Sequence, residues 1–178
     1  MAEVFVNALA KSTGIVTTSN NCSVGITSTV IAGVSTVNLG VGYLVDNQHF
    51  NGGTKVVSID STSQVTVDKA STNTAPANTQ PVSFLGPTVS YTSPSGTKSI
   101  LIGGTFANLT NNNVNITVEV VTGITSAVLA NNIPVPGGSS FVISDAGKTV
   151  LTSDNVINVY SDTPNSIDVT LGILQGVN

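Results

Sequence analysis

The stretch that decides the fold runs from Lys98 to Val121 and reads KSILIGGTFANLTNNNVNITVEVV. In its second half, valine or isoleucine occupies every even position from 114 to 120, and Asn115, Thr117 and Glu119 lie between them. A period of two places the apolar side chains on one face of a strand and the polar ones on the other. The preceding segment offers a matching apolar face, and the asparagines at 111–113 tolerate the left-handed backbone of a turn. The stretch predicts a β-hairpin at the centre of a sheet.

The composition extends this expectation to the whole chain. Its 178 residues suffice for one domain, or two small ones, with a real core. Only 8% of the residues are charged, far below the roughly 25% of typical soluble domains, and valine, threonine, serine, asparagine and glycine take their place. Valine and threonine favour strands, whereas glycine and asparagine favour turns. We expect an all-β fold, a β-sandwich of jelly-roll or Ig-like type.

Short strands precede the decisive stretch. Val57 and Ile59 are followed by Val65 and Val67, with a three-residue turn at 61–63 between the two segments, which predicts a hairpin over 55–68. Residues 71–81 show no period and contain two prolines, so they are interpreted as a surface loop or linker. Later strands are longer, with a turn predicted at 145–147.

The charge pattern excludes several classes of partner. The net charge is −4, arginine is absent and the five lysines are scattered, so the clustered cations that bind nucleic acid are missing. No apolar stretch approaches the ~20 residues of a membrane helix, and the first residues do not resemble a secretory signal. We expect a soluble product of the cytosol, with a neutral hydroxyl- and amide-rich surface that suits a packed assembly.

Few residues offer chemistry. His49 is the only histidine and lies in a loop-like segment, so it is interpreted as a solvated loop residue rather than a general base. Cys22 is the only cysteine, which excludes an intrachain disulfide and favours a small, inert thiol. Residues 52–55, Gly-Gly-Thr-Lys, lack the spacing of a phosphate-binding loop. The Asn-X-Ser/Thr sequons at Asn21, Asn108 and Asn115 are taken as chance matches.

The carboxylates are isolated along the sequence, and most lie beside turns. Nothing points to a calcium loop, although folding can still bring two of them together as in a glycosidase. The sequence therefore predicts no catalytic residue, no cofactor-binding residue and no metal ligand. The carboxylates are Glu3, Asp46, Asp60, Asp68, Glu119, Asp145, Asp154, Asp162 and Asp168.

Two stretches resemble known proteins. The order of motifs from Ser93 to Leu174 resembles small β-sandwich virion structural proteins of tailed bacteriophages, notably marine, cyanophage-like ones. The residues that carry this resemblance are 94–98 (PSGTK), 102–104 (IGG), 107–110 (ANLT), 132–140 (NIPVPGGSS), 161–162 (SD), and near the N-terminus 4–7 (VFVN) with 10–11 (AK).

The second stretch resembles a short β module that recurs in phage structural proteins. It comprises 33–42, 52–59 (GGTKVVSI), 65–67 and Ala70. Together the two resemblances imply a β-sandwich formed by residues 1–19 and 83–178, with a small β-rich subdomain inserted at 20–82.

The resemblance implies a function without turnover. The expected protein is a structural component of the virion, made in the host cytoplasm, most simply an exterior decoration or cement-type protein of the head. Its partners would be further copies of itself, with a trimer as the first guess, and other capsid or tail proteins. An N-terminal arm such as Ala2–Lys11 is expected to complete a neighbour's sheet. The alternatives are a tail, neck or fibre-attachment protein, and a tail-borne glycan-binding or glycan-hydrolysing module.

Overall fold

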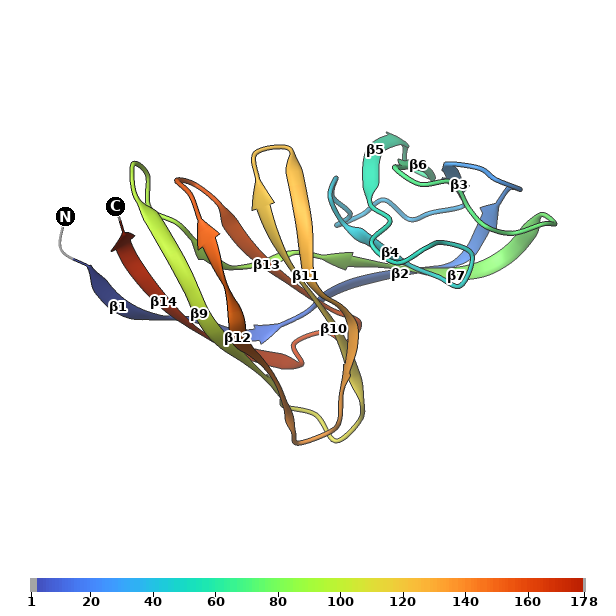
Figure 1. Ribbon diagram of the computed structural model, residues 1–178. Coiled ribbons are helices and arrows are strands. Elements are labelled where there is room, and N and C mark those ends of the chain that lie inside the picture. The colour runs from blue at the N-terminus through green and yellow to red at the C-terminus, as the bar shows by residue number, and fades with distance from the viewer. Residues whose placement is uncertain (1–2, 178) are drawn as a thin grey trace. The chain divides into compact units, whose positions relative to one another are not determined.

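The computed structural model describes residues 3–177, and all of their side chains except those of residues 145–147. The described residues form fourteen strands and no helix, which confirms the all-β fold class (Figure 1). The chain divides into two compact units. One contains the described residues up to Gly14 together with those from Thr88 onward, and the other contains Ile15–Pro87. No helix long and apolar enough to cross a membrane is present in the described part.

The first unit is a β-sandwich of two four-stranded antiparallel sheets. The first sheet has the order β1-β14-β9-β12, and the second sheet has the order β11-β10-β13-β8. The strands are β1 (Val4–Thr13), β8 (Thr88–Thr92), β9 (Lys98–Asn108), β10 (Val114–Thr122), β11 (Thr125–Val135), β12 (Ser140–Leu151), β13 (Val156–Ser161) and β14 (Ile167–Val177).

One core holds the two sheets of the sandwich together. Phe106 and Leu171 reach into it from the first sheet, and Ile116 and Val159 from the second. Phe106 also lies 6.0 Å from Phe141, measured between ring centres. Burying such side chains contributes about 1.5–3 kcal/mol each, which is the main force that joins the sheets.

The hairpin predicted over 98–121 is wrong, although both of its strands exist. β9 belongs to the first sheet and β10 to the second, so the two strands face each other across the core instead of pairing. The connection changes sheets next to Asn108, whose side-chain amide donates to the carbonyl oxygens of Asn112 and Val135 at 2.7 and 2.8 Å. Two apolar strand faces are buried equally well in either arrangement, so alternation alone does not distinguish them.

The turn predicted at 145–147 falls inside β12. The pairing of β12 with β9 is interrupted there, because its register shifts between Ser144 and Thr149. β1 pairs along Val4–Ala10 with β14 of its own chain, so the N-terminal strand completes the first sheet of the same molecule. Ala2 of the expected arm lies outside the described residues.

The second unit is a six-stranded antiparallel sheet of order β4-β7-β2-β3-β6-β5. A bridge between Leu44 and Lys55 links its first strand to the start of its last, so the sheet curls around a core of its own that includes Ile31, Val65 and Phe84. The strands are β2 (Ile15–Val24), β3 (Val30–Ala32), β4 (Leu44–Asp46), β5 (Val56–Ser61), β6 (Gln64–Val67) and β7 (Ala77–Gly86).

The hairpin predicted over 55–68 is confirmed as β5 paired with β6. Its facing differs, because Val56 is buried whereas Val57 and Ile59 are exposed. The loop predicted at 71–81 is wrong from Ala77 onward, where β7 begins.

The chain passes from one unit to the other at residues 14–15 and 87–88, whereas the resemblance implied boundaries at 19–20 and 82–83. Residues 15–19 of β2 pair with residues 82–86 of β7 inside the second unit, which accounts for the difference.

Candidate functional site

His49 borders a pocket of about 580 Å3 in the second unit. Its ring approaches the side chain of Gln48 at 3.5 Å, and its carbonyl oxygen accepts a hydrogen bond from the amide of Thr72 at 2.8 Å. The pocket lining contains amides and hydroxyls but no carboxylate that could orient the imidazole. This arrangement lacks the third member of a nucleophile–base–acid triad.

Cys22 is buried in the core of the second unit, as the sequence predicted for an inert thiol. Burial raises the pKa of this thiol, while hydrogen bonding opposes that shift in part. The side chain is 0% exposed, so the reactive thiolate form is both disfavoured and inaccessible.

The carboxylates with known partners serve mainly in local structure. Asp60 accepts hydrogen bonds from Ser58 and Thr66 at 2.6 and 2.7 Å, which lowers its pKa, and Asp168 accepts one from the amide of Ser12 at 2.8 Å. Within the described residues, no three His, Cys, Asp or Glu side chains gather as a metal site would require. Asp145 has no described side chain.

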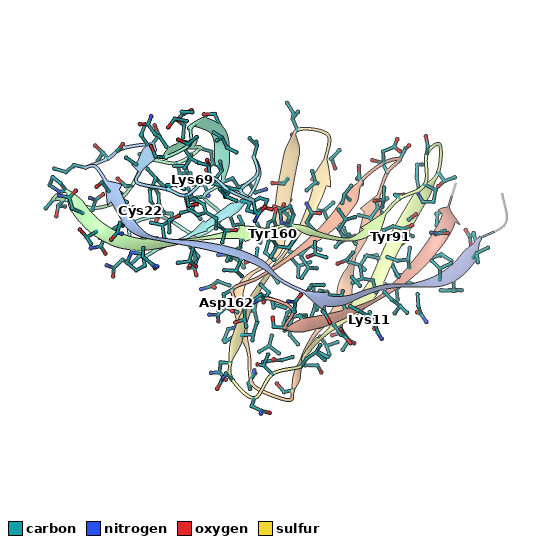
Figure 2. The ribbon with its side chains drawn as sticks, turned by 180° about the vertical axis from the view of Figure 1, so that it is seen from behind. Lys11, Cys22, Lys69, Tyr91, Tyr160 and Asp162 are labelled. Carbon is teal, nitrogen blue, oxygen red and sulfur yellow. The ribbon has the colours of Figure 1, made fainter. Side chains whose placement is uncertain are left out.

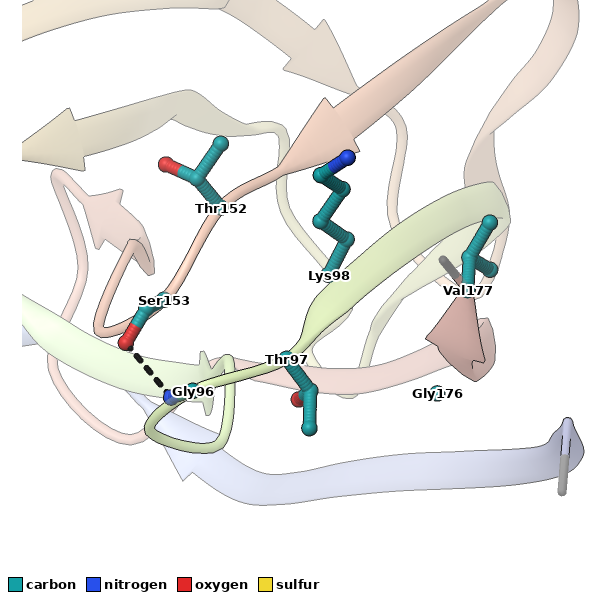
Figure 3. A pocket seen from close by; sticks show the side chains of 7 residues that line it. All are labelled: Gly96, Thr97, Lys98, Thr152, Ser153, Gly176 and Val177. Carbon is teal, nitrogen blue, oxygen red and sulfur yellow. Dashed lines mark hydrogen bonds between the residues drawn. The ribbon is translucent and has the colours of Figure 1, made fainter. Parts of the chain in front are cut away.

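A second pocket, of about 570 Å3, opens at one end of the sandwich (Figure 3). Lys98 is its ionisable residue, and the Ser153 hydroxyl there accepts a hydrogen bond from the amide of Gly96 at 3.0 Å. The lining offers no acid or base beside the lysine for proton transfer. It consists of Gly96, Thr97, Lys98, Thr152, Ser153, Gly176 and Val177.

The polar face of β10 contains a buried pair that the sequence did not predict. Alternation placed Glu119 on the polar face of its strand. The residue is 1% exposed, and its carboxylate accepts a hydrogen bond from the hydroxyl of Tyr160 on β13 at 2.5 Å. Tyr160, labelled in Figure 2, is equally buried. Burial raises the pKa of Tyr160 strongly, and the hydrogen bond and charge of Glu119 raise it further.

This pair predicts a pH-dependent effect of Tyr160→Phe. At neutral pH the variant should lose about 2 kcal/mol of stability, because a hydrogen bond to a charged acceptor is lost. In the wild type, stability should fall above pH 10.0, the ordinary pKa of tyrosine, because the unfolded chain then releases a proton that the folded chain retains.

The expected slope from this residue is about 1.4 kcal/mol per pH unit, and Tyr160→Phe should lack it. Denaturation at pH 7, 10 and 11.5 measures both effects. If the variant and the wild type lost stability equally between pH 10 and 11.5, the assignment to Tyr160 would be wrong.

The most extensive candidate surface is the outer face of the first sheet, defined as the face turned away from the sandwich core. One row of cross-strand neighbours on this face is entirely apolar. It runs from β1 to β12 through Phe5, Leu174, Ile100 and Val150, of which Phe5 is 75% exposed and Val150 54%.

A second row crosses the same four strands through Leu9, Thr170, Thr105 and Val142. Leu9 is 68% exposed and Val142 54%, while Ile102 on β9 adds a further exposed apolar side chain. Neither row contains a charged residue. Exposed apolar side chains gathered on one face of a sheet mark a place where another molecule binds.

Compared with models of protein families, with curated proteins and with solved structures, the chain matches none of them. Among the described residues, the outer face of the first sheet is the feature that points to a function, namely binding to another molecule.

Proposed function

We propose that this protein is a non-enzymatic, homo-oligomeric structural component of a tailed-phage virion, on the exterior of the head. The observation that carries the assembly role is the pair of uncharged cross-strand rows on the outer face of the first sheet, one from Phe5 to Val150 and one from Leu9 to Val142. The virion setting is supported by the motif resemblance across Ser93–Leu174. The mechanism is adhesion through buried apolar area and strand contacts, without turnover.

The size of the outer face suits this role. Four strands about 4.8 Å apart, with about ten residues rising about 3.3 Å each, give a face of about 600 Å2 in plan. Stable protein–protein interfaces bury about 800 Å2 on each partner, and side chains make the accessible area larger than the plan. Little charge repulsion opposes contact between two copies of these rows, because neither row contains a charged residue.

A paired substitution tests the assembly role. Ile102→Asp with Val150→Asp places two charges on exposed positions of the outer face. We expect at least about a tenfold weaker self-association, because the charges would be desolvated in the interface. Light scattering coupled to gel filtration gives the mass, and circular dichroism checks folding.

Val37→Asp with Val41→Asp adds the same charge at exposed positions of the second unit and serves as the control. It should leave the mass unchanged. A wild-type protein that remains monomeric at high concentration and does not bind particles lacking it would contradict the proposal.

Cryo-electron microscopy of the intact particle tests the location and gives the copy number. Density on the outer head surface is the expected result. Density in the tail, neck or fibre-attachment region would contradict the head location and favour the alternative position on the particle. Absence from the particle would refute the virion role.

A further inference from the structure

The edge strand β1 lacks the features by which natural proteins protect a sheet edge. One of its edges pairs with β14 in unbroken register from Val4 to Ala10. Its other edge pairs with no strand in the described part of the chain. Between Val4 and Ala10 there is no proline, glycine, charge or bulge. Such an edge is a template for another strand.

Both faces of β1 are apolar and incompletely covered. Phe5 and Leu9 project from the outer face, where they are 75% and 68% exposed. Val6 and Ala8 point to the sandwich core and pack against it, but they remain only half-buried. A further strand paired beside β1 would place its own side chains next to these on both faces of the sheet.

The sequence of β1 is complementary to itself when it is reversed about Asn7. In an antiparallel pair centred on Asn7, Phe5 faces Leu9 of the second copy, and Val6 faces Ala8. At each end, Glu3 of one copy faces Lys11 of the other, and both residues are exposed (Lys11 is labelled in Figure 2). Phe5, Asn7 and Leu9 share one face by alternation, and Glu3 and Lys11 continue the same period at either end. The Phe5–Leu9 and Glu3–Lys11 pairs therefore meet on that face, and the Val6–Ala8 pair meets on the other.

We propose that two copies of this protein pair β1 against β1, antiparallel, about a two-fold axis at Asn7. The two first sheets then form one continuous sheet of eight strands, and the apolar rows of the two outer faces join. The proposal rests on the proposed function, because it names the surface and the register of one self-contact. A second copy is the occupant because its strand places an opposite charge at each end of the pair and an apolar side chain opposite each apolar one. A two-fold contact can also link copies within a larger assembly.

A single cysteine tests the axis directly. Opposed Cα atoms in an antiparallel pair lie about 4.5 or 5.5 Å apart, a separation that a disulfide spans. Asn7→Cys should therefore form a covalent dimer in nearly all chains under mild oxidation. Leu9→Cys alone should not, because its copy across the axis is offset by four residues, about 13 Å.

The register is tested by mixing two variants. Phe5→Cys and Leu9→Cys chains together should give the mixed disulfide dimer, although neither does so alone. The wild-type chain is the control for the native thiol, since Cys22 is 0% exposed. Disulfides that form equally from Asn7→Cys, from Leu9→Cys alone and from the mixture would overturn the proposed register.

The charge pairs provide an independent test without cysteines. Glu3→Lys places like charges at both ends and should weaken dimerisation about tenfold in low salt, measured by analytical ultracentrifugation. Adding Lys11→Glu reverses both charges and should restore the wild-type affinity. A double variant as weak as Glu3→Lys would overturn the pairing.

The outcomes separate this inference from the proposed function. If Asn7→Cys gives no covalent dimer while the wild type still self-associates and Ile102→Asp with Val150→Asp dissociates it, the β1 pairing is wrong and the assembly role stands. If the wild type is monomeric at every concentration, the assembly role falls as well.

Discussion

Replacing Val118 by aspartate is expected to cost the sandwich about 4 kcal/mol or more, a large share of the stability of an ordinary domain. Val118 is 0% exposed and lies on β10, between Ala130 of β11 and Val159 of β13. An aspartate there would place a charge among apolar side chains of both sheets. Urea denaturation followed by circular dichroism measures the loss, and much of the protein should be insoluble on expression.

Val89→Asp is the matched control for this result. Val89 lies on β8, in the same sheet, but it is 58% exposed. The same substitution there should change stability by no more than about 0.5 kcal/mol. Ordinary stability of Val118→Asp would contradict the placement of the alternating apolar set of β10 in the core.

The alternation around β10 shows what local sequence can predict. Val114, Ile116 and Val118 are all buried, as a period of two requires. The same pattern does not identify the neighbouring strands, which are β11 and β13 rather than β9. It also does not reveal that Glu119 is buried, since alternation tells which residues share a face but not whether that face is covered.

Strand β2 of the second unit shows that a polar composition makes a strand difficult to predict from sequence. Residues 17–23 are polar apart from Cys22, a composition that does not indicate a strand, yet they belong to β2. Threonine and serine fit a strand whose hydroxyls bond across it, as Thr18 does with Ser83 at 2.9 Å. Hydrophobic periodicity is weak in such a strand, so the pairing partner decides its structure.

The candidate surface was only partly predictable. The alternating Val4 and Val6 favour a strand at the N-terminus, and the apolar odd positions Phe5 and Leu9 are an additional signal. A strand that is apolar on both faces needs a cover on each side. The rows through Ile100 and Val150 depend on the register of four strands that are distant in sequence, which no local pattern contains.

After Val118→Asp, the substitution with the largest expected loss of stability is Gly14→Ala, although it adds only one methyl group. Gly14 ends the first segment of the sandwich, and its φ of +123° lies in a region that side chains rarely adopt. A Cβ there would overlap the carbonyl oxygen of Thr163. That oxygen is held in place by the hydroxyls of Ser161 and Ser166, at 3.0 and 2.7 Å.

Gly14→Ala should therefore lower the free energy of unfolding by about 3 kcal/mol or more, because backbone strain and the clash add. The clash would also disturb the hydrogen bond from the amide of Asn165 to the carbonyl of Gly14, at 3.2 Å. Denaturation monitored by circular dichroism measures the loss.

Gly96→Ala separates the two causes of that loss. Gly96 also has a positive φ, +72°, but no atom lies within 4 Å of the Cβ that an alanine would add. Strain alone should cost about 1–2 kcal/mol there. A larger loss for Gly14→Ala than for Gly96→Ala measures the contact with Thr163, and hence how firmly residues 163–166 hold the end of β1. Equal losses would show that this segment yields to the added methyl group and that the strand end is less constrained than its hydrogen bonds indicate.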